Sequence, residues 1–228
     1  MHILSGIAVF GLMTGTAIAA PRPVVVELFT SQGCSDCPPA DALLRHVQAA
    51  DPDVLALDLH VTYWNNALWS DPFSLQGATD LQSQYASFRG SSEVYTPEAV
   101  VDGRTQFVGS DSGAMAAAIS QAKATIGKDG TIPVSVSAPD GQVSVHVGPG
   151  TGAGTVWLFG FDPERTTRVR GGENGGATLT EVNVVRSITT LGTWNGNALQ
   201  KEIPAPAGTK FAVLVQRPDG EILAAARD

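Results

Sequence analysis

The only two cysteines of this 228-residue chain, Cys34 and Cys37, form a C-x-x-C motif. An apolar run at 24–29 precedes the motif, and a pattern with helical spacing at 40–47 follows it. Two cysteines at a strand-to-helix turn are typical of redox dithiols, which alternate between two thiols and a disulfide. The motif therefore predicts thiol–disulfide exchange.

Two other roles for the pair stay open. A structural disulfide is one, although closing a four-residue loop stabilises a fold by only ~2 kcal/mol, against roughly 4.7 kcal/mol for a hundred-residue loop. A metal site is the other, but structural zinc needs four nitrogen or sulfur ligands, and the chain has no second C-x-x-C and no H-x3-H. We therefore assign no metal ligands.

The composition is that of a globular protein. Apolar residues make up 43% of the chain and charged residues 16%, which suits one large domain or two small ones. A formal net charge of -8, without any run of Lys or Arg, argues against nucleic acid and anionic membranes as partners. No phosphate-binding motif of the form GxxxxGK[ST] is present, and we expect no cofactor.

Residues 1–20 predict an export signal peptide. The stretch 3–18 carries no charge, and Ala17-Ile18-Ala19 fits a small-residue cleavage site. No Lys or Arg precedes this stretch, so an uncleaved membrane anchor stays an alternative. Export would place the mature chain in the periplasm or outside the cell. Both are oxidising environments in which a disulfide can form and persist. After cleavage we expect no integral membrane span.

The first half alternates between strand and helix patterns. Asp36 is the predicted N-cap of the first helix, and Asp71-Pro72 the predicted start of a later one. Asp58 and His60 are two residues apart in a strand and so share one face. The predicted order is strand, helix, strand, helical insertion, hairpin and helix, at 24–29, 40–47, 54–61, 62–92, 98–108 and 111–126.

The second half has the period of strands. Val143, Val145 and Val147 alternate with polar residues, and Pro-Asp-Gly turns occur at 139–141 and 218–220. About seven strands without a helical pattern predict an antiparallel sandwich or barrel. These strands are expected at 132–137, 142–147, 155–161, 178–190, 198–203, 211–216 and 221–225.

Residues 27–41, which include the C-x-x-C motif, resemble the hallmark of a secreted bacterial family called domain of unknown function 1223. Further matching stretches lie at 60–64, 95–97, 101–103, 172–175 and 183–186, and Asn65 departs from the acid that many members carry. The resemblance implies an α/β thioredoxin-like domain with a helical insertion at 21–128. An all-β antiparallel sandwich-like domain at 131–228 then follows. The resemblance supplies no substrate.

The resemblance also implies chemical roles. Cys34 is the attacking thiolate at an accessible helix start, and Cys37 is the resolving thiol. The Asp36 carboxylate lies between the two cysteines in sequence and disfavours a negative charge on sulfur, so we expect a more reducing dithiol. The alternative is that Asp36 points away from the sulfurs and caps the helix. Pro97 resembles the cis proline that faces such dithiols and makes the backbone of Thr96 available to a substrate chain. A trans proline at a strand start is the alternative.

Four further side chains are candidates. Glu27 can accept the proton of the resolving cysteine, or it is a strand-end carboxylate with an ordinary partner. His60 can act as a base near the sulfurs, although a satisfied core histidine is more common. Trp64 and Trp69 can form a substrate wall, although packing within the insertion is the more common role of such aromatics.

The leading hypothesis is an exported thiol–disulfide oxidoreductase that acts on thiols or disulfides of other exported proteins with the help of a redox partner. The alternative is a non-catalytic envelope binding module on a thioredoxin-like scaffold, with the polar stretch 165–176 as its binding surface or simply as a solvated loop. Copper or peroxide handling is a weaker third option, because a thiolate pair suits Cu(I) but no methionine cluster accompanies it.

Overall fold

The computed structural model describes residues 22–128 and 130–228, so the predicted signal peptide at 1–20 lies outside the described residues. The described chain forms three α-helices, eleven strands and one short 3-10 turn. In chain order these are β1 (Val24–Thr30), α1 (Pro38–Ala50), β2 (Val54–His60), α2 (Gln76–Phe88), β3 (Glu98–Val101), β4 (Thr105–Val108), α3 (Ser112–Thr125), β5 (Val134–Ser137), η1 (Pro139–Gly141), β6 (Gln142–Val147), β7 (Gly154–Arg168), β8 (Thr178–Trp194), β9 (Leu199–Pro204), β10 (Lys210–Gln216) and β11 (Ile222–Arg227).

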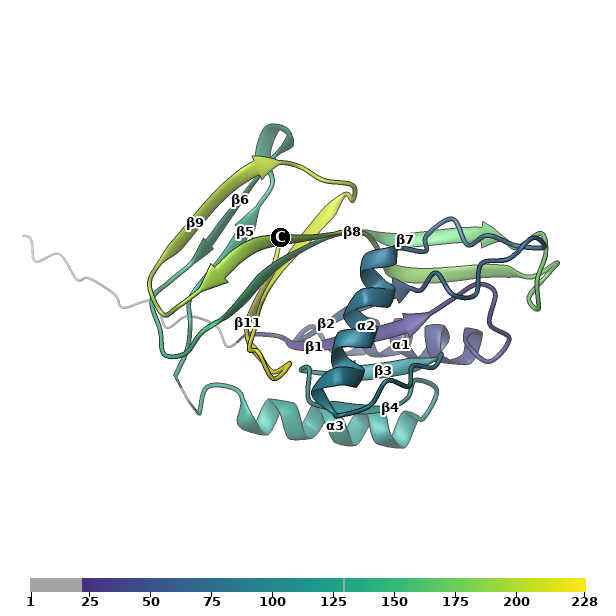
Figure 1. Ribbon diagram of the computed structural model, residues 1–228, viewed down its shortest axis with the longest axis horizontal. Helices are drawn as coiled ribbons and strands as arrows, with labels where there is room; N and C mark the ends of the chain where they lie inside the picture. Colours follow the sequence, from purple (N-terminus) through teal and green to yellow (C-terminus); the bar gives the residue numbers. More distant parts are fainter. Residues whose placement is uncertain (1–21, 129) are drawn as a thin grey trace, which may run out of the picture.

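Eight of these strands form one mixed sheet in the order β11-β10-β7-β8-β2-β1-β3-β4. β2 pairs in parallel with β1 on one side and with β8 on the other, and the other pairs in this sheet are antiparallel. A second sheet has the order β5-β6-β9. Figure 1 shows the long β7–β8 hairpin running from the second sheet past α2 to the opposite end of the molecule.

The helices cover both faces of the large sheet (Figure 1). α2 packs on one face, where its Leu81 and Tyr85 join a core that extends to β10 and β11. α1 and α3 pack on the opposite face, where Leu44 and Met115 meet the apolar side chains of β1 and β2. The three-stranded sheet encloses a third core around the fully buried Trp194.

The predicted fold class is wrong. An α/β thioredoxin-like domain followed by a separate antiparallel sandwich-like domain does not describe a mostly β molecule in which strands from both halves build one sheet. The halves join where Asp58 of β2 pairs in parallel with Val184 of β8. All seven residues of β2 are buried, so this strand needs a neighbour on each side. The partner comes from beyond the predicted boundary at 128–131.

Two local predictions also need correction. α1 has Cys37 as its N-cap, without a side-chain capping bond, and the predicted cap Asp36 is exposed. Two prolines fill the first turn, where missing N–H groups cost little. Asp71 does not begin a helix, because α2 starts only at Gln76 and the Asp71 carboxylate is buried instead.

Asn183 of β8 stabilises the contact between the two halves of the chain. Its φ of 48° lies in the left-handed region, which asparagine tolerates better than most residues. Its side-chain amide donates hydrogen bonds of 2.9 Å to the Gln48 side chain in α1 and 2.9 Å to the Ala56 carbonyl in β2. One side chain of β8 therefore holds both a strand and a helix of the first half.

We predict that Asn183→Ala lowers the free energy of unfolding by about 2–4 kcal/mol, because two buried hydrogen bonds are lost and a left-handed backbone becomes strained. Urea unfolding followed by circular dichroism measures the change. Asn183→Gly removes the bonds but relieves the backbone, so it should recover about 1 kcal/mol of the loss. Wild-type midpoints for both variants would contradict the assignment.

Candidate functional site

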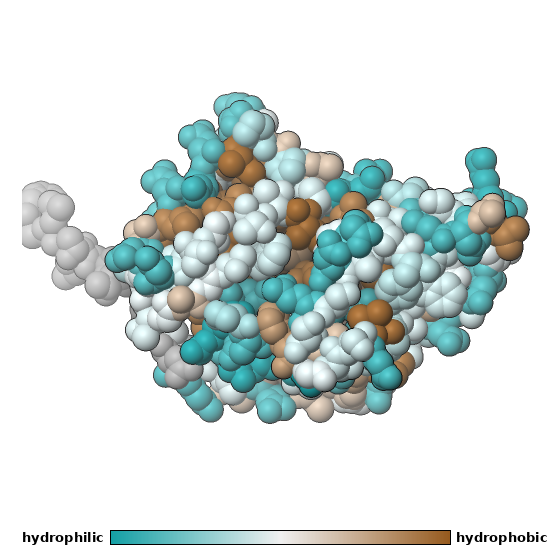
Figure 2. All heavy atoms as spheres, viewed as in Figure 1, coloured by the Kyte–Doolittle hydropathy of each residue, from teal (hydrophilic) through white to brown (hydrophobic). Residues whose placement is uncertain are grey.

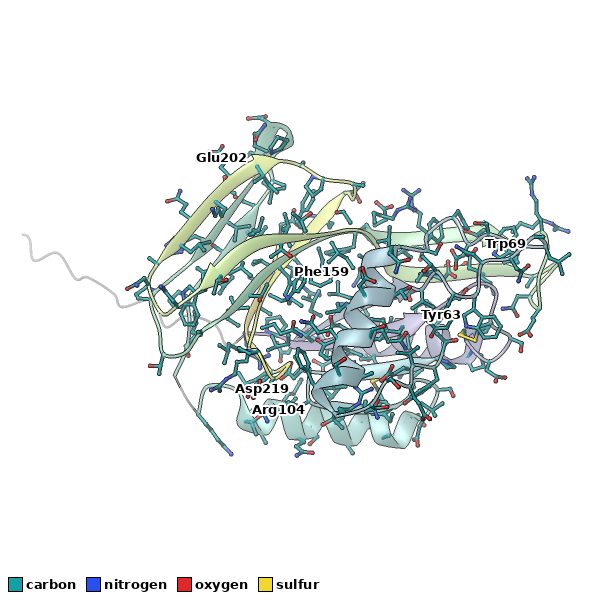
Figure 3. All side chains as sticks on the ribbon, viewed as in Figure 1. Tyr63, Trp69, Arg104, Phe159, Glu202 and Asp219 are labelled. Carbon is teal, nitrogen blue, oxygen red and sulfur yellow. A yellow bond between two sulfur atoms is a disulfide. The ribbon has the colours of Figure 1, made fainter. Side chains whose placement is uncertain are left out.

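Cys34 and Cys37 form a disulfide at the turn between β1 and α1, with their Cα atoms 5.5 Å apart. Figure 3 shows the yellow disulfide bond at the end of the molecule where Tyr63 and Trp69 are labelled. Only 1% of the surface of Cys34 and 0% of that of Cys37 is exposed. The expected accessible position is therefore wrong for this state of the protein, and the sulfurs lie beneath other parts of the chain.

The turn 169–177 between β7 and β8, here called the hairpin tip, lies directly on the C-x-x-C turn. The Glu173 carboxylate accepts a hydrogen bond of 3.0 Å from the Ser35 backbone N–H. The Asn174 side chain donates hydrogen bonds of 3.1 Å to the Gln32 carbonyl and 2.8 Å to the Cys34 carbonyl. Sequence reasoning described this stretch as a solvated loop or a separate binding surface, whereas it docks on the disulfide.

A second segment, the connection 62–75 between β2 and α2, contacts the same turn. Trp64 packs beside Gly33, where an added Cβ would lie 3.3 Å from the Trp64 Cβ. The Trp64 indole N–H donates a hydrogen bond of 2.6 Å to the Thr96 hydroxyl. The Thr96–Pro97 peptide bond is cis, as predicted. Trp64 and Thr96 thus lie together next to the turn that carries Cys34.

The hairpin tip and the connection 62–75 also pack on each other. A side chain does not fit at Gly171, because its Cβ would lie 2.1 Å from the Leu68 carbonyl oxygen. Gly172 has a φ of 71°, and an added Cβ there would lie 3.2 Å from the Trp69 Cβ. Trp69 therefore packs against the tip, and the two segments form one cover over the disulfide.

Five buried ionisable side chains gather where β1 and β2 end, and we call them the buried cluster: Asp41, Asp58, His60, Asp71 and Glu181. His60 Nδ1 lies 2.7 Å from Asp71 Oδ2, and His60 Nε2 lies 3.6 Å from Asp58 Oδ2 and 4.0 Å from Glu181 Oε1. His60 Nε2 and both Asp58 oxygens have no hydrogen-bond partner among the described residues. Ionisable groups this deeply buried are typical of sites that handle protons.

Residues of the C-x-x-C region bond directly to the buried cluster. The Gln32 side chain donates to Glu181 at 2.9 Å, and the Gln32 backbone N–H donates to Asp71 at 2.8 Å. Thr30 at the end of β1 donates its hydroxyl to Asp41 at 2.8 Å. Asp41 lies one helical turn after Cys37, and its N–H donates to the Cys37 carbonyl at 3.1 Å. The cluster and the disulfide therefore share one stretch of backbone.

Burial and the charges of neighbouring groups shift the pKa values of the cluster residues in different directions. Burial raises the pKa of Asp41 and of Asp58, and it raises the pKa of Glu181 to about 7 although the His60 charge opposes it. Burial alone would lower the pKa of His60, but the charges of Asp71 and Asp58 raise it well above 6.5. The His60 charge and hydrogen bonds hold the pKa of Asp71 low. His60 and Asp71 thus form an ion pair beside three carboxyls whose pKa values are raised.

Glu27, the predicted proton acceptor, lies on the other face of the sheet. Its β1 neighbours Val25 and Phe29 join the core under α2, whereas Thr30 bonds to Asp41 on the α1 side. The Glu27 carboxylate accepts a hydrogen bond from the hydroxyl of Tyr85 in α2. Burial raises the pKa of Glu27 to about 7, although the Tyr85 hydrogen bond opposes the shift. The structure therefore does not bring Glu27 to the disulfide.

Sequence reasoning placed Asp58 on the same face as His60 but took Asp71 for a helix cap and did not identify Asp41 or Glu181. Asp41 had a signal, since it lies between Ala40 and Leu44 on the side of the helix that must be buried. Glu181 had none, because its place depends on the pairing of β8 with β2. Glu173 and Asn174 lie in a stretch that resembles the family, but nothing in their residue types indicates contact with the C-x-x-C turn.

Three further observations concern metal-binding groups, membrane-spanning helices and cavities. Within residues 22–128 and 130–228, no group of three or more His, Cys, Asp or Glu side chains is arranged to hold a metal ion. No described helix combines the length and apolarity needed to cross a membrane. A groove of about 740 Å³ lies between α3 and β11, and none of its lining residues belongs to the hairpin tip, the connection 62–75 or the C-x-x-C turn.

Comparison with known proteins confirms the family that the C-x-x-C hallmark predicts. The family model described as "Protein of unknown function (DUF1223)" matches residues 25–216. The crystal structure of protein AGR_C_4864 from Agrobacterium tumefaciens is 31% identical, with a TM-score of 0.77 over 91% of this chain and 94% of that chain. HBP35 of Porphyromonas gingivalis shares the fold at 15% identity, with a TM-score of 0.59 over 91% of this chain and 75% of that one. No curated protein matches.

We predict that the stability of the protein falls between pH 5 and pH 8, and that Glu27→Gln weakens this fall. The folded-state pKa of Glu27, about 7, lies above its ordinary 4.5, so folding favours the protonated form. This contribution is fully present below pH 4.5 and is lost as the pH rises through 7, and it amounts to about 3 kcal/mol at most. The raised pKa values of Asp41, Asp58 and Glu181 act in the same direction.

Urea unfolding midpoints at pH 5 and pH 8 test this dependence for the wild type and Glu27→Gln. Glu202→Gln is the matched control, because Glu202 is an exposed carboxylate on β9 (Figure 3). If Glu27→Gln shows the same difference between pH 5 and pH 8 as the wild type and the control, Glu27 does not take up a proton on folding.

Proposed function

The chain belongs to the DUF1223 family of proteins of unknown function, and we propose that it is a thiol–disulfide oxidoreductase. The Cys34–Cys37 disulfide supports this proposal most directly, because it closes a turn too short to stabilise the fold much and sits next to a buried ionisable cluster. Trp64 packs beside Gly33 and bonds to Thr96, so the backbone around Thr96 lies near the same turn.

The proposed reaction starts from the reduced protein. The Cys34 thiolate attacks one sulfur of a substrate disulfide, so a bond from Cys34 Sγ to that sulfur forms, the substrate S–S bond breaks, and one substrate thiolate leaves. The Cys37 thiol loses its proton and attacks Cys34 Sγ, which restores the protein disulfide and releases the second substrate thiolate. In the net reaction, the substrate disulfide gains two electrons and two protons and becomes two thiols. The protein dithiol loses two electrons and two protons and becomes a disulfide.

Asp41 is the proposed acceptor of the Cys37 proton. It lies one helical turn after Cys37, its pKa is raised by burial and by the Asp58 charge, and it bonds to Thr30 at the end of β1. A carboxylate with a raised pKa is a stronger base than an ordinary aspartate, which suits it to accept the proton of a thiol. His60 keeps its own proton because of Asp71, and its positive charge partly offsets the negative charges of the neighbouring carboxylates.

The proposed substrates are disulfides of exported proteins in the periplasm or outside the cell. Tyr63 and Leu68 in the connection 62–75 are 44% and 77% exposed, and exposed apolar side chains beside a reactive turn suit an extended polypeptide. Figure 2 shows mainly hydrophilic residues at the end of the molecule that carries the hairpin tip, with a small apolar group among them. The direction of electron flow follows from the redox partner.

The burial of both cysteines favours a second candidate function, a non-catalytic envelope binding module. In this case the disulfide stays closed and holds the C-x-x-C turn under the hairpin tip. Arg170 of the tip and the adjacent Arg168 of β7 are exposed and would bind the partner. The two functions differ in whether the disulfide can be reduced without unfolding the protein.

We predict that the mature protein catalyses reduction of insulin disulfides by dithiothreitol and that Cys34→Ser abolishes turnover, because the attacking sulfur is gone. Cys37→Ser should instead accumulate a mixed disulfide with the substrate, visible by mass spectrometry. A disulfide that resists reduction by glutathione and thioredoxin at every potential above about -300 mV would exclude the oxidoreductase and favour the binding module.

We also predict that Asp41→Asn slows release of the second substrate thiol at least about tenfold at pH 7, because Cys37 loses its proton acceptor. Single-turnover measurements between pH 6 and pH 9 should show the defect shrinking as the pH rises and hydroxide replaces Asp41. Asp80→Asn is the control, since Asp80 is exposed on α2 and accepts a hydrogen bond from the Gln76 side chain. An unchanged pH profile in Asp41→Asn would rule out this role.

A further inference from the structure

The hairpin tip has a fixed shape that holds two polar side chains against the C-x-x-C turn. Backbone hydrogen bonds between Val169 and Ala177 (2.9 Å), and between Gly176 and Val169 (2.9 Å), close the tip. Gly171 and Gly172 let it approach the connection 62–75 without side chains in the way. The placement of Glu173 and Asn174 therefore follows from the local fold of the tip.

The contacts of the tip are with backbone groups on both sides of the Cys34 side chain. Asn174 binds the carbonyls of Gln32 and Cys34, and Glu173 binds the N–H of Ser35. The Ser35 nitrogen is four covalent bonds from Cys34 Sγ, so the Glu173 carboxylate, 3.0 Å from that nitrogen, lies within about 8 Å of the sulfur. The tip thus brings a carboxylate close to the thiol that must ionise.

α1 offers few N–H groups for a thiolate at its start. Pro38 and Pro39 have none, and the Cys37 N–H already donates to the Cys34 carbonyl at 3.3 Å. A thiolate at a helix start is stabilised by such donors. Glu173 occupies the N–H of Ser35, so it removes a donor from the neighbourhood of Cys34 and adds a negative charge there.

Glu173 is ionised when the thiol titrates. The hydrogen bond from the Ser35 backbone lowers the pKa of Glu173 below 4.5, and a like charge disfavours a second anion nearby. The other ionisable groups of the elements around the turn are Asp36, Asp41, Arg45, Asp58, His60, Asp71, Arg168, Arg170 and Glu181. Of these and Glu173, only Glu173 accepts a hydrogen bond from the residue that follows Cys34.

We propose that Glu173 tunes Cys34: with the tip docked, its carboxylate suppresses the Cys34 thiolate, and with the tip displaced, the thiol becomes both exposed and more acidic. Glu173 acts through the Ser35 N–H and does not touch the reacting sulfur, so it is a positioning residue. The inference rests on the proposed thiol–disulfide exchange and adds a control that couples substrate access to thiolate formation.

The test is the pH dependence of Cys34 alkylation by iodoacetamide in the reduced mature protein, with the modified cysteine identified by mass spectrometry. Glu173→Gln keeps an oxygen that can accept from Ser35 but removes the charge. We expect it to lower the apparent pKa of the Cys34 thiol by about half a unit, which makes alkylation at pH 7 about threefold faster. Glu164→Gln, an exposed carboxylate on the same hairpin, should leave the profile unchanged.

Two results would overturn the inference. One is an alkylation profile of Glu173→Gln that matches the wild type. The other is a rate increase of the same factor at every pH, because this would mean that Glu173 only holds the cover in place. Alkylation needs no turnover, so a failure here leaves disulfide reduction by the wild type intact, whereas a failure of the insulin assay leaves the thiol pKa measurable. Thermal melts verify that both variants fold.

Discussion

The parallel contact between β2 and β8 determines what surrounds the disulfide. β2 is buried along its whole length, and β8 satisfies its open edge. The same strand then carries Glu181 into the buried cluster and brings the hairpin tip over the C-x-x-C turn. Without this contact, the hairpin tip would not cover the disulfide and Glu181 would not reach the buried cluster. The same strand pairing therefore determines both the fold and the site.

The buried cluster works against stability as much as for it. Four carboxyls and an imidazole leave water together, and the His60–Asp71 pair offsets only part of the desolvation. Several of their polar atoms have no hydrogen-bond partner among the described residues. An apolar set of side chains would pack at lower cost in this position next to the C-x-x-C turn. Groups arranged in this way are expected where protons must be taken up and released.

Local signals in the sequence predict the elements well and their assembly poorly. The hairpin at 98–108 and the strand at 142–147 match β3, β4 and β6, because turn residues and strand period are local properties. The division into two folds fails because the pairing of Asp58 with Val184 joins segments far apart in the chain. By contrast, the Cys34–Cys37 disulfide and the cis bond at Pro97 depend on local sequence and are predictable, whereas the position of the hairpin tip is not.

The cover over the disulfide is compatible with the proposed exchange chemistry although both cysteines are buried. Within the described residues, three hydrogen bonds of two tip side chains hold the tip to the C-x-x-C turn, and none of these bonds involves an apolar residue of the three core clusters. Such contacts open at a lower free energy than the sheet itself unfolds. An extended substrate offers backbone N–H and C=O groups of the same kind, so it can replace the tip bond for bond at Cys34 and Ser35. In the proposed exchange, displacement of the tip by a polypeptide would expose the sulfurs and remove the Glu173 charge in one step, so the thiol would become reactive only when a substrate binds.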